Sequence, residues 1–193
     1  MNSPGGGVNP AERVLLQEAA EWRLISLLFE CPAGAWRDRL ELLSADVPDP
    51  ALRQAAQAAR SEASEGMYHS LFGPGGPVPP REVSYRGGMG AGHLLAGIAA
   101  YYQAFAFRPD TMEADDHIAV ETGFIAYLKV KEAYALACGN PEHAALASEA
   151  APEFIGNHLS LWIAPLVRAL EAAAPPYLAA AGALLQARIA RIL

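Results

Sequence analysis

The sequence predicts an all-α protein: a single compact helical domain of about eight or more helices, arranged in two sub-bundles joined by a hinge. Apolar residues recur at spacings of three and four, which is typical of helices with one buried face. No segment alternates apolar and polar residues as a half-buried strand does, and no unit of about 20–50 residues repeats. Of the 193 residues, 52% are hydrophobic and 18% are charged, which supplies enough apolar material for a core.

Start and stop signals place the helices in order. A Gly/Pro-rich stretch over 1–9 predicts a disordered tail, and Pro10 then suits the first turn of a helix. The expected helices cover 11–29, 35–43, 51–72, 91–105, 116–138, 152–172 and 176–193. Gly66 weakens the third of these helices, and Pro165 is the candidate for a kink in the sixth.

The polar stretch 106–116 separates an N-terminal sub-bundle, reaching to about residue 105, from a C-terminal sub-bundle that runs to residue 193. A polar connection that contains proline is expected to act as a hinge between helical sets. If it opens, two chains can exchange halves without forming new contacts. The sequence therefore predicts a monomer with a minor domain-swapped dimer.

Charge and composition exclude several classes of protein. The formal net charge of −7 disfavours nucleic-acid binding, which needs Lys and Arg to neutralise phosphates, and favours a basic partner. The start of the chain lacks the charged and apolar regions of a signal peptide, and no apolar run is long enough to insert in a membrane. A cytoplasmic protein is expected. Cys31 and Cys138 are too far apart for a CxxC motif and are expected to be buried.

Catalytic signatures are absent from the sequence. It contains no phosphate-binding glycine loop, no HExxH and no GxSxG, and no two of its five histidines stand four residues apart. The sequence therefore predicts no enzyme, no cofactor and no metal ion.

An acidic run is the feature that stands out most. Five carboxylates lie between Arg108 and Lys129 with no Lys or Arg among them: Asp110, Glu113, Asp115, Asp116 and Glu121. One interpretation is the acidic start of a helix, with Asp115 or Asp116 as its N-cap. A second is a concave site whose carboxylates bind guanidinium groups, with His117 as a switch near neutral pH. A third makes Asp116, His117 and Glu121 metal ligands or acid–base groups.

Two aromatic segments flank this run. Tyr68, Leu71 and Phe72 end a helix before a rigid Pro/Gly loop, and they are interpreted either as core residues or as the wall of a peptide groove. His158 and Trp162 stand four residues apart in the late segment, which is interpreted as core.

Together these pieces resemble the TorD/DmsD family of molybdoenzyme maturation chaperones, also called redox enzyme maturation proteins. The resemblance covers about residues 12–190. Its motifs, in order, are Trp22 with Leu28-Phe29, Tyr68-x-x-Leu71-Phe72-x-Pro74, Glu82-x-Ser84-Tyr85, Glu113-Ala114-Asp115-Asp116-His117 and Phe154-x-x-x-His158-Leu159-x-x-Trp162. The family's acidic element reads Glu-Pro-x-Asp-His, so Ala114 replaces a proline here.

The resemblance implies a cytoplasmic chaperone without catalytic activity. Its expected partners are the precursor of a molybdopterin-containing catalytic subunit and the twin-arginine leader peptide of that precursor, which is held until the cofactor has been inserted. The expected client-binding residues are Tyr68, Leu71, Phe72, Pro74, Ser84, Tyr85, Glu113, Asp116, His117 and Glu121. The alternatives are a small acid–base or metal-dependent enzyme using Asp116, His117 and Glu121, and a plain helical scaffold.

Overall fold

The computed structural model describes residues 9–88 and 90–193, and within these ranges the chain is helical, which confirms the expected all-α class. The α-helices are α1 (Pro10–Leu28), α2 (Trp36–Asp46), α3 (Pro50–Glu62), α4 (Glu65–Phe72), α5 (Ala91–Ala104), α6 (Ile118–Ala137), α7 (Pro141–Asn157), α8 (Ile163–Ala173) and α9 (Pro176–Ile192). Two 3-10 turns, η1 (Glu82–Ser84) and η2 (Leu159–Leu161), complete the described elements. The expected disordered tail lies outside the described residues except for Asn9, which is the N-cap of α1.

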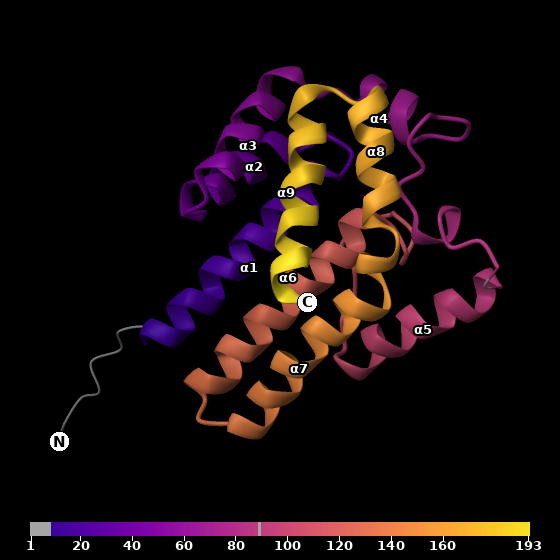
Figure 1. Ribbon diagram of the computed structural model, residues 1–193. Coiled ribbons are helices and arrows are strands. Elements are labelled where there is room, and N and C mark those ends of the chain that lie inside the picture. Colours follow the sequence, from indigo (N-terminus) through magenta and orange to yellow (C-terminus); the bar gives the residue numbers. More distant parts are fainter. Residues whose placement is uncertain (1–8, 89) are drawn as a thin grey trace.

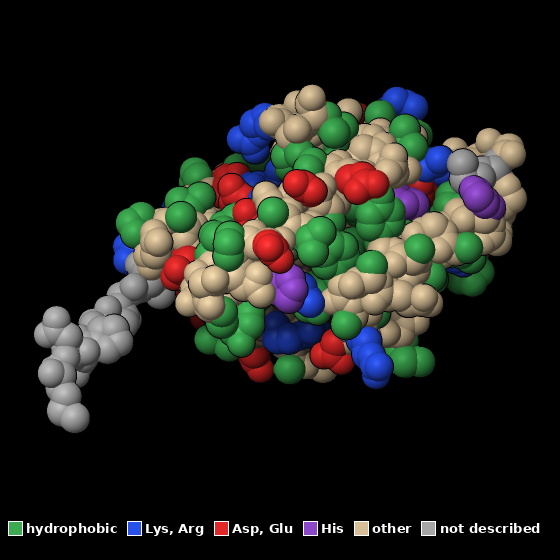
Figure 2. All heavy atoms as spheres, turned by 90° about the horizontal axis from the view of Figure 1, so that it is seen from below, with side chains coloured by type: hydrophobic (Ala, Val, Ile, Leu, Met, Phe, Trp, Pro, Cys, Tyr) green, Lys and Arg blue, Asp and Glu red, His purple; other side chains and the backbone are tan. Residues whose placement is uncertain are grey.

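The helices share one core. Figure 1 shows α6 and α7 side by side and α8 beside α9, while α5 lies at the periphery. The most extensive packing joins α1 to α6, and α3 packs against α9. Helices of the expected N-terminal sub-bundle therefore pack directly on helices of the expected C-terminal sub-bundle. On the face seen in Figure 2, apolar, acidic and basic side chains are interspersed. None of the described helices has the length and apolarity needed to cross a bilayer.

The α1–α6 contact is close because the residues between the two helices are small. A Cβ on Gly123 would lie 3.2 Å from the Ser26 hydroxyl oxygen. That hydroxyl donates a hydrogen bond of 2.8 Å to the carbonyl of Ala119, so the two helices are also joined by a buried polar contact. Together these contacts fix the spacing of α1 and α6.

The connection over 106–116 is held by ring packing and by a hydrogen bond to α5. It begins with Ala106 in the left-handed region, at φ 54°. Phe107 packs on the rings of Tyr102 and Tyr127, and the Tyr102 hydroxyl donates to the carbonyl of Asp115 over 2.9 Å. Hinge motion about this connection and the swapped dimer stay predictions.

The expected single helix over 51–72 is wrong, because it is divided into α3 and α4. The break falls at Ala63 and Ser64, both in extended conformations, and the Ser64 hydroxyl accepts a hydrogen bond from the amide of Met67 as the N-cap of α4. Gly66 lies within α4 and does not break it. Serine is a strong N-cap residue because its side chain satisfies an amide that has no partner in the helix.

The expected helix over 152–172 is also wrong. Pro152 lies inside α7, whose N-cap Asn140 accepts from the amide of His143. The chain then leaves the helix at His158, where η2 separates α7 from α8. Pro165 lies in the first turn of α8, where proline is tolerated, so it is not a kink in a longer helix.

The two cysteines differ in exposure. Both are free thiols; Cys31 is half-buried and Cys138 is exposed. The expectation that both are buried is therefore wrong.

Candidate functional site

His117 organises the start of α6. Its Nδ1 accepts a hydrogen bond of 3.2 Å from the amide of Ala119, so His117 is the N-cap, and the expectation that Asp115 or Asp116 caps this helix is wrong. Because Nδ1 accepts, the proton of the neutral ring is assigned to Nε2, which lies 3.3 Å from the Tyr68 hydroxyl oxygen. The Tyr68 hydroxyl in turn donates to Glu113 over 2.7 Å.

Burial sets the protonation of this cluster. Burial lowers the pKa of His117 from 6.5 to about 4, and this outweighs the opposing effect of the nearby carboxylates of Glu113 and Asp116. His117 is therefore neutral at neutral pH, and the expected switch near neutral pH is wrong. Burial and the hydrogen bond to Glu113 raise the pKa of Tyr68, so its hydroxyl keeps its proton.

Asp116 faces inward and binds the loop that precedes α5. Its Oδ1 accepts from Arg81 Nε over 2.7 Å, and its Oδ2 accepts from the amide of Val83 over 3.2 Å. The backbones pair at the same place, since Glu82 N–H donates to Asp116 O and Ile118 N–H donates to Pro80 O, each over 2.9 Å. The buried carboxylate thus ties the loop to the start of α6.

A second pair of carboxyl groups, Glu82 and Glu121, lies in the interior. Glu82 bonds Arg86 through Oε1 and His158 Nδ1 through Oε2, at 2.5 and 2.9 Å. Glu121 Oε2 accepts from Trp162 Nε1 over 3.3 Å, while its Oε1 is buried without a hydrogen-bond partner. Burial and the neighbouring Glu82 raise the pKa of Glu121 well above its ordinary value, which favours the protonated form of this carboxyl group.

Glu82 was missing from the residues expected at the site, although it lies in the quoted motif. The available signal was an acidic residue inside a Pro/Gly-rich loop, where nothing local requires one. Its partner His158 stands 76 residues away in the sequence. The break between α7 and α8 coincides with these contacts: His158 and Trp162 have non-helical dihedral angles where they meet Glu82 and Glu121.

The structure divides the expected client-binding residues by exposure. The buried ones are Tyr68, Leu71, Phe72, Asp116, His117 and Glu121. Pro74 and Ser84 are exposed, while Tyr85 and Glu113 are half-buried. Tyr68 and Phe72 meet edge to face, with ring centroids 5.1 Å apart, and Tyr85 stacks on Trp162 at 5.5 Å. The expected concave site with Asp116 and Glu121 open to solvent is therefore not the arrangement found.

The residues described contain no group of three His, Cys, Asp or Glu side chains arranged to hold a metal ion. Asp116, His117 and Glu121, the ligands considered from sequence, bond instead to Arg81, to the amide of Ala119 and to Trp162. The metal interpretation therefore finds no support in their geometry.

An apolar groove of about 450 Å³ runs between α1 and α6. We call it the α1–α6 groove; Ala19, Val120 and Ala126 line its floor, and Leu16 and Val130 line its exposed rim. Residues 107–111 of the connection also line it, as does Glu30, which follows the C-terminal end of α1. The groove is thus adjacent to the acidic run, and sequence reasoning did not find it because it depends on two helices about 100 residues apart.

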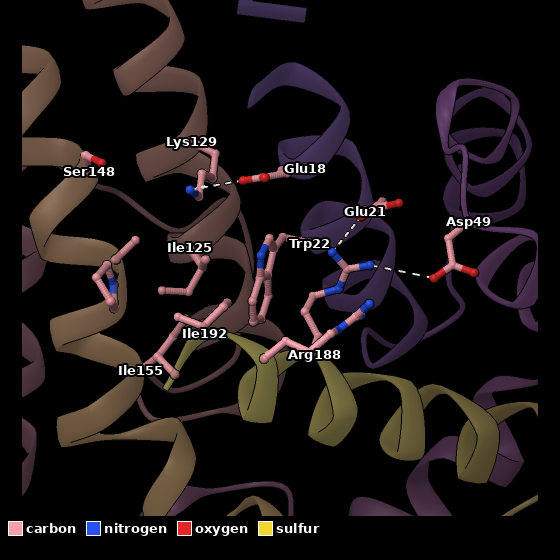
Figure 3. A pocket seen from close by; sticks show the side chains of 13 residues that line it. Glu18, Glu21, Trp22, Asp49, Ile125, Lys129, Ser148, Ile155, Arg188 and Ile192 are labelled. Carbon is pink, nitrogen blue, oxygen red and sulfur yellow. Dashed lines mark ion pairs between the residues drawn. The ribbon is translucent and has the colours of Figure 1, made fainter. Parts of the chain in front are cut away.

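A pocket of about 510 Å³ lies on the other side of the α1–α6 pair. Figure 3 shows the Arg188 guanidinium pointing toward Glu21 and Asp49, to which it is bonded at 2.5 and 3.7 Å. The same guanidinium lies 5.9 Å from the Trp22 ring centroid, and Lys129 pairs with Glu18 at 3.0 Å. The ion pairs of Arg188 tie α9 to α1 and to Asp49, the N-cap of α3, which indicates a structural role.

The comparisons with known proteins agree on one group. The family model described as nitrate reductase delta subunit matches residues 40–168, from α2 into α8. The chain is 30% identical to the selenate reductase assembly chaperone protein of Thauera selenatis and 29% identical to the chlorate reductase assembly chaperone protein of Ideonella dechloratans. Each match extends over 165 residues, 82% of this chain and 79% of the relative.

Proposed function

The chain belongs to the nitrate reductase delta subunit family of molybdoenzyme maturation chaperones, and from this premise we propose that it is the assembly chaperone of the catalytic subunit of a molybdopterin-containing oxidoreductase. Its two relatives are named as assembly chaperones of selenate and chlorate reductases. The client is the precursor of the catalytic subunit, held in the cytoplasm without any chemical reaction on it.

The finer part of the proposal is that the chain binds the precursor's twin-arginine leader peptide. The observation that carries it is a carboxylate at the α1–α6 groove: Asp110 is exposed and lines the groove, and half-buried Glu113 and exposed Asp115 follow it in the connection. We call these three residues the acidic rim. Carboxylates bind guanidinium groups through charge-assisted hydrogen bonds, and an apolar leader segment gains free energy by leaving water.

The geometry favours binding over catalysis. Asp116, His117 and Glu121 have internal partners, and none of them lines the α1–α6 groove or the charged pocket. An acid–base reaction needs such groups within hydrogen-bond reach of a substrate. We therefore keep the chaperone as the single proposed function.

Co-purification tests the proposal that the chain is the assembly chaperone of a catalytic subunit. The tagged chain should retain the precursor of a molybdopterin-containing catalytic subunit from the same genome, and should retain less of that precursor once the leader is deleted. If neither form is retained, the chaperone assignment fails. Equal retention of both forms would remove the leader from the proposal and leave the body of the subunit as the client.

Calorimetric titration with the leader peptide tests the acidic rim. Glu113→Lys should weaken binding, since it reverses a charge beside the groove. Glu171→Lys is the matched control, because it makes the same charge change on an exposed residue of α8 that lines neither pocket described above. Equal affinities in the two variants would exclude the rim as the arginine site.

A further inference from the structure

A cleft of about 340 Å³ lies between α5 and α7, away from the α1–α6 groove, with which it shares no lining residue. α5 lies at the periphery of the fold (Figure 1). We call this feature the α5–α7 cleft. The side chains that matter below are Tyr101, Ala104 and Phe105 on one wall and Leu146, Glu149 and Glu153 on the other.

The charge on the α5–α7 cleft has one sign. Glu149 and Glu153 are its charged lining residues; both are exposed, and they share one face of α7 because they are four residues apart. α7 contains no Lys or Arg, and the sequence from Gly87 to Phe107, which includes α5, contains no Asp, Glu, Lys or Arg. The lining is therefore acidic, with no cation to offset it.

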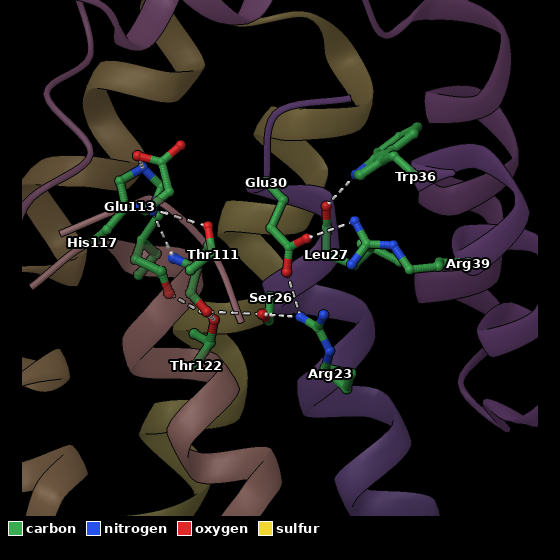
Figure 4. Close-up of polar contacts among 12 residues, drawn as sticks. Arg23, Ser26, Leu27, Glu30, Trp36, Arg39, Thr111, Glu113, His117 and Thr122 are labelled. Atoms are coloured by element: carbon green, nitrogen blue, oxygen red, sulfur yellow. Dashed lines mark hydrogen bonds and ion pairs between the residues drawn. The ribbon is translucent and has the colours of Figure 1, made fainter. Parts of the chain in front are cut away.

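The two carboxylates are available to a partner. None of the ion pairs among the described residues includes Glu149 or Glu153. Glu30 differs in this respect, because Figure 4 shows it between Arg23 and Arg39, with which it forms ion pairs. Like charges four residues apart destabilise a helix slightly, and a cation from a partner would relieve that repulsion in α7.

Two aromatic rings complete a site for a cationic side chain. The Tyr101 hydroxyl accepts from Asn157 over 3.0 Å, and its ring meets that of Phe154 edge to face, with centroids 5.2 Å apart. Phe105 is half-buried and packs on the ring of Phe124. Carboxylates bind a guanidinium or ammonium group through charge-assisted hydrogen bonds, and aromatic faces attract it through cation–π interaction. The cleft supplies both kinds of group.

The rest of the surface beside the carboxylates is apolar. Leu146 is 57% exposed. The neighbouring lining residues Ala100, Ala104 and Ala150 are small, so a partner can approach closely. A second hollow of about 510 Å³ shares Ala104 and Leu146 with the cleft and extends to Tyr134, which is 71% exposed. Adjoining apolar residues of this exposure are typical of protein interaction sites.

The second hollow has the opposite charge. Lys131 lines it, with its ammonium group 5.3 Å from the centroid of the Tyr127 ring. A partner's cation is therefore attracted to the α5–α7 cleft and repelled from the second hollow, which leaves the hollow to apolar side chains. The surface as a whole selects a segment with a basic residue at one end and apolar residues beside it.

We propose that the α5–α7 cleft docks the mature part of the client, outside its leader, by binding an Arg or Lys that lies next to a large apolar side chain on the catalytic subunit. The cation pairs with Glu149 and Glu153 against the ring of Tyr101, and its apolar neighbour covers Leu146 and Tyr134. This inference rests on the proposed function and adds a second contact to it.

Two sites on one client chain raise the affinity together. Because the cleft and the α1–α6 groove share no lining residue, the leader and the mature part can be bound at the same time. Once the leader is bound, the mature segment is tethered nearby, so even a weak second site increases the overall affinity. The whole precursor is therefore expected to bind about tenfold more tightly than the leader peptide, or more tightly still.

Charge reversal tests the carboxylates. Glu149→Lys combined with Glu153→Lys should bind the leaderless catalytic subunit about tenfold more weakly, while binding of the leader peptide stays within about twofold. The matched control is Glu62→Lys combined with Glu171→Lys, two exposed residues of α3 and α8 that line neither hollow, and it should bind both within about twofold. Equal losses in the two double variants would show that net charge alone attracts the subunit, and would overturn the cleft.

The variant Glu149→Gln/Glu153→Gln separates recognition from folding. It removes the repulsion within α7, so the free energy of unfolding should not fall. Its binding of the leaderless subunit should be weaker at low salt and should depend less steeply on salt than that of the unmodified protein. An unchanged salt dependence would show that the two carboxylates do not meet a cation of the subunit.

The apolar part is tested by Leu146→Ser, which should weaken binding of the leaderless subunit about fivefold. The control Leu42→Ser changes a leucine of α2 that is 73% exposed and lines neither hollow, and it should bind within about twofold. Light scattering on the same samples identifies the competing occupant. A dimer of the unmodified protein that dissociates in Leu146→Ser would show that a second copy covers the cleft, and would overturn the proposal.

These measurements separate the inference from the proposed function. If the unmodified protein binds neither the precursor nor its leaderless form, the proposed function fails. If it binds the precursor but not the leaderless form, or if the cleft variants bind the leaderless form as the unmodified protein does, only the inference fails.

Discussion

Two sets of carboxyl groups lie within one short stretch of this chain, and they differ in almost every property. Asp110 and Asp115 are exposed and Glu113 is half-buried, whereas Asp116 and Glu121 are fully buried. Of the outward set, Asp110 lines the α1–α6 groove, while the inward set bonds to the loop around Glu82 and to Trp162, the N-cap of α8. The comparison teaches that an acidic run in sequence is not an acidic surface.

The cause of this division is the register at the start of α6. The bridge between Arg81 and His117 brings the loop onto the chain just before the helix, and this turns Asp116 toward Val83 and Arg81. Glu121 follows one helical turn after His117 and so points into the same interior. We infer that the inward set holds the fold and that the outward set is free for a client.

The largest expected effect that tests this division is the pH dependence of stability from His117. Its folded pKa is about 4, below the ordinary 6.5, so the unfolded state takes up a proton first as the pH falls. The contribution of the buried neutral ring is present above about pH 6.5 and is lost between about pH 6.5 and 4, by about 3 kcal/mol in total. Urea unfolding at several pH values across this window measures the loss.

The control for His117 is His117→Asn, whose side chain can accept from the amide of Ala119 but does not titrate. The free energy of unfolding of this variant should fall less steeply with decreasing pH. Parallel curves for the two proteins would show that His117 is not neutral and buried in solution.

The second prediction contrasts two adjacent residues, Asp116 and Asp115. Asp116→Ala removes the bonds to Arg81 and Val83 and should lower the free energy of unfolding by roughly 2–3 kcal/mol. Asp115→Ala, one position earlier on an exposed side chain, should change it by less than about 0.5 kcal/mol. Similar losses in both variants would contradict the division into inward and outward sets.

The third prediction concerns the buried carboxyl group of Glu121, whose pKa is raised. A raised folded pKa gives stability that is present below the ordinary carboxyl value of 4.5 and is lost as the pH rises toward the folded value. Glu121→Gln keeps the acceptor for Trp162 without a proton to lose. It should therefore be more stable than the unmodified protein at high pH.

Thermal unfolding across the pH range from about 5 to 9 measures the advantage of Glu121→Gln, which should grow with pH. A constant difference between the two proteins would mean that Glu121 does not titrate in this range.

The smallest expected effect on stability belongs to the outward set. Asp110→Asn combined with Asp115→Asn should leave the free energy of unfolding within about 0.5 kcal/mol, because exposed carboxylates contribute little. The same variant should bind the arginine-containing leader peptide about threefold more weakly, with a shallower dependence on salt. Unchanged binding at low salt would argue that neither Asp110 nor Asp115 takes part in binding the leader.

Much of the fold could be predicted because its signals are local. Asn9 and Pro10 begin α1 through a capping box with Glu12, and Pro176 begins α9. The errors fell where a local signal was weak or was overridden. The only local signal for the break between α3 and α4 was the hydroxyl of Ser64, which caps α4. The break between α7 and α8 had no local signal, because His158 and Trp162 bond there to carboxyl groups that are distant in the sequence.

The candidate site was less predictable than the fold. The sequence brought Tyr68, Glu113 and His117 into one set, and the structure places them in one hydrogen-bonded cluster. It did not identify the α1–α6 groove, because nothing local distinguishes a groove-lining Leu16 from a core leucine.

The sequence by itself determined the all-α class, the acidic run and most helix ends, since periodicity and capping act within a few residues. Only the tertiary structure decided which carboxyl groups are buried. Asp116 meets Arg81 from 35 residues away and Glu121 meets Trp162 from 41, and burial, protonation and partner all follow from those encounters. The physical reason is that the free energy of a charge depends on its surroundings, which the fold assembles from distant segments.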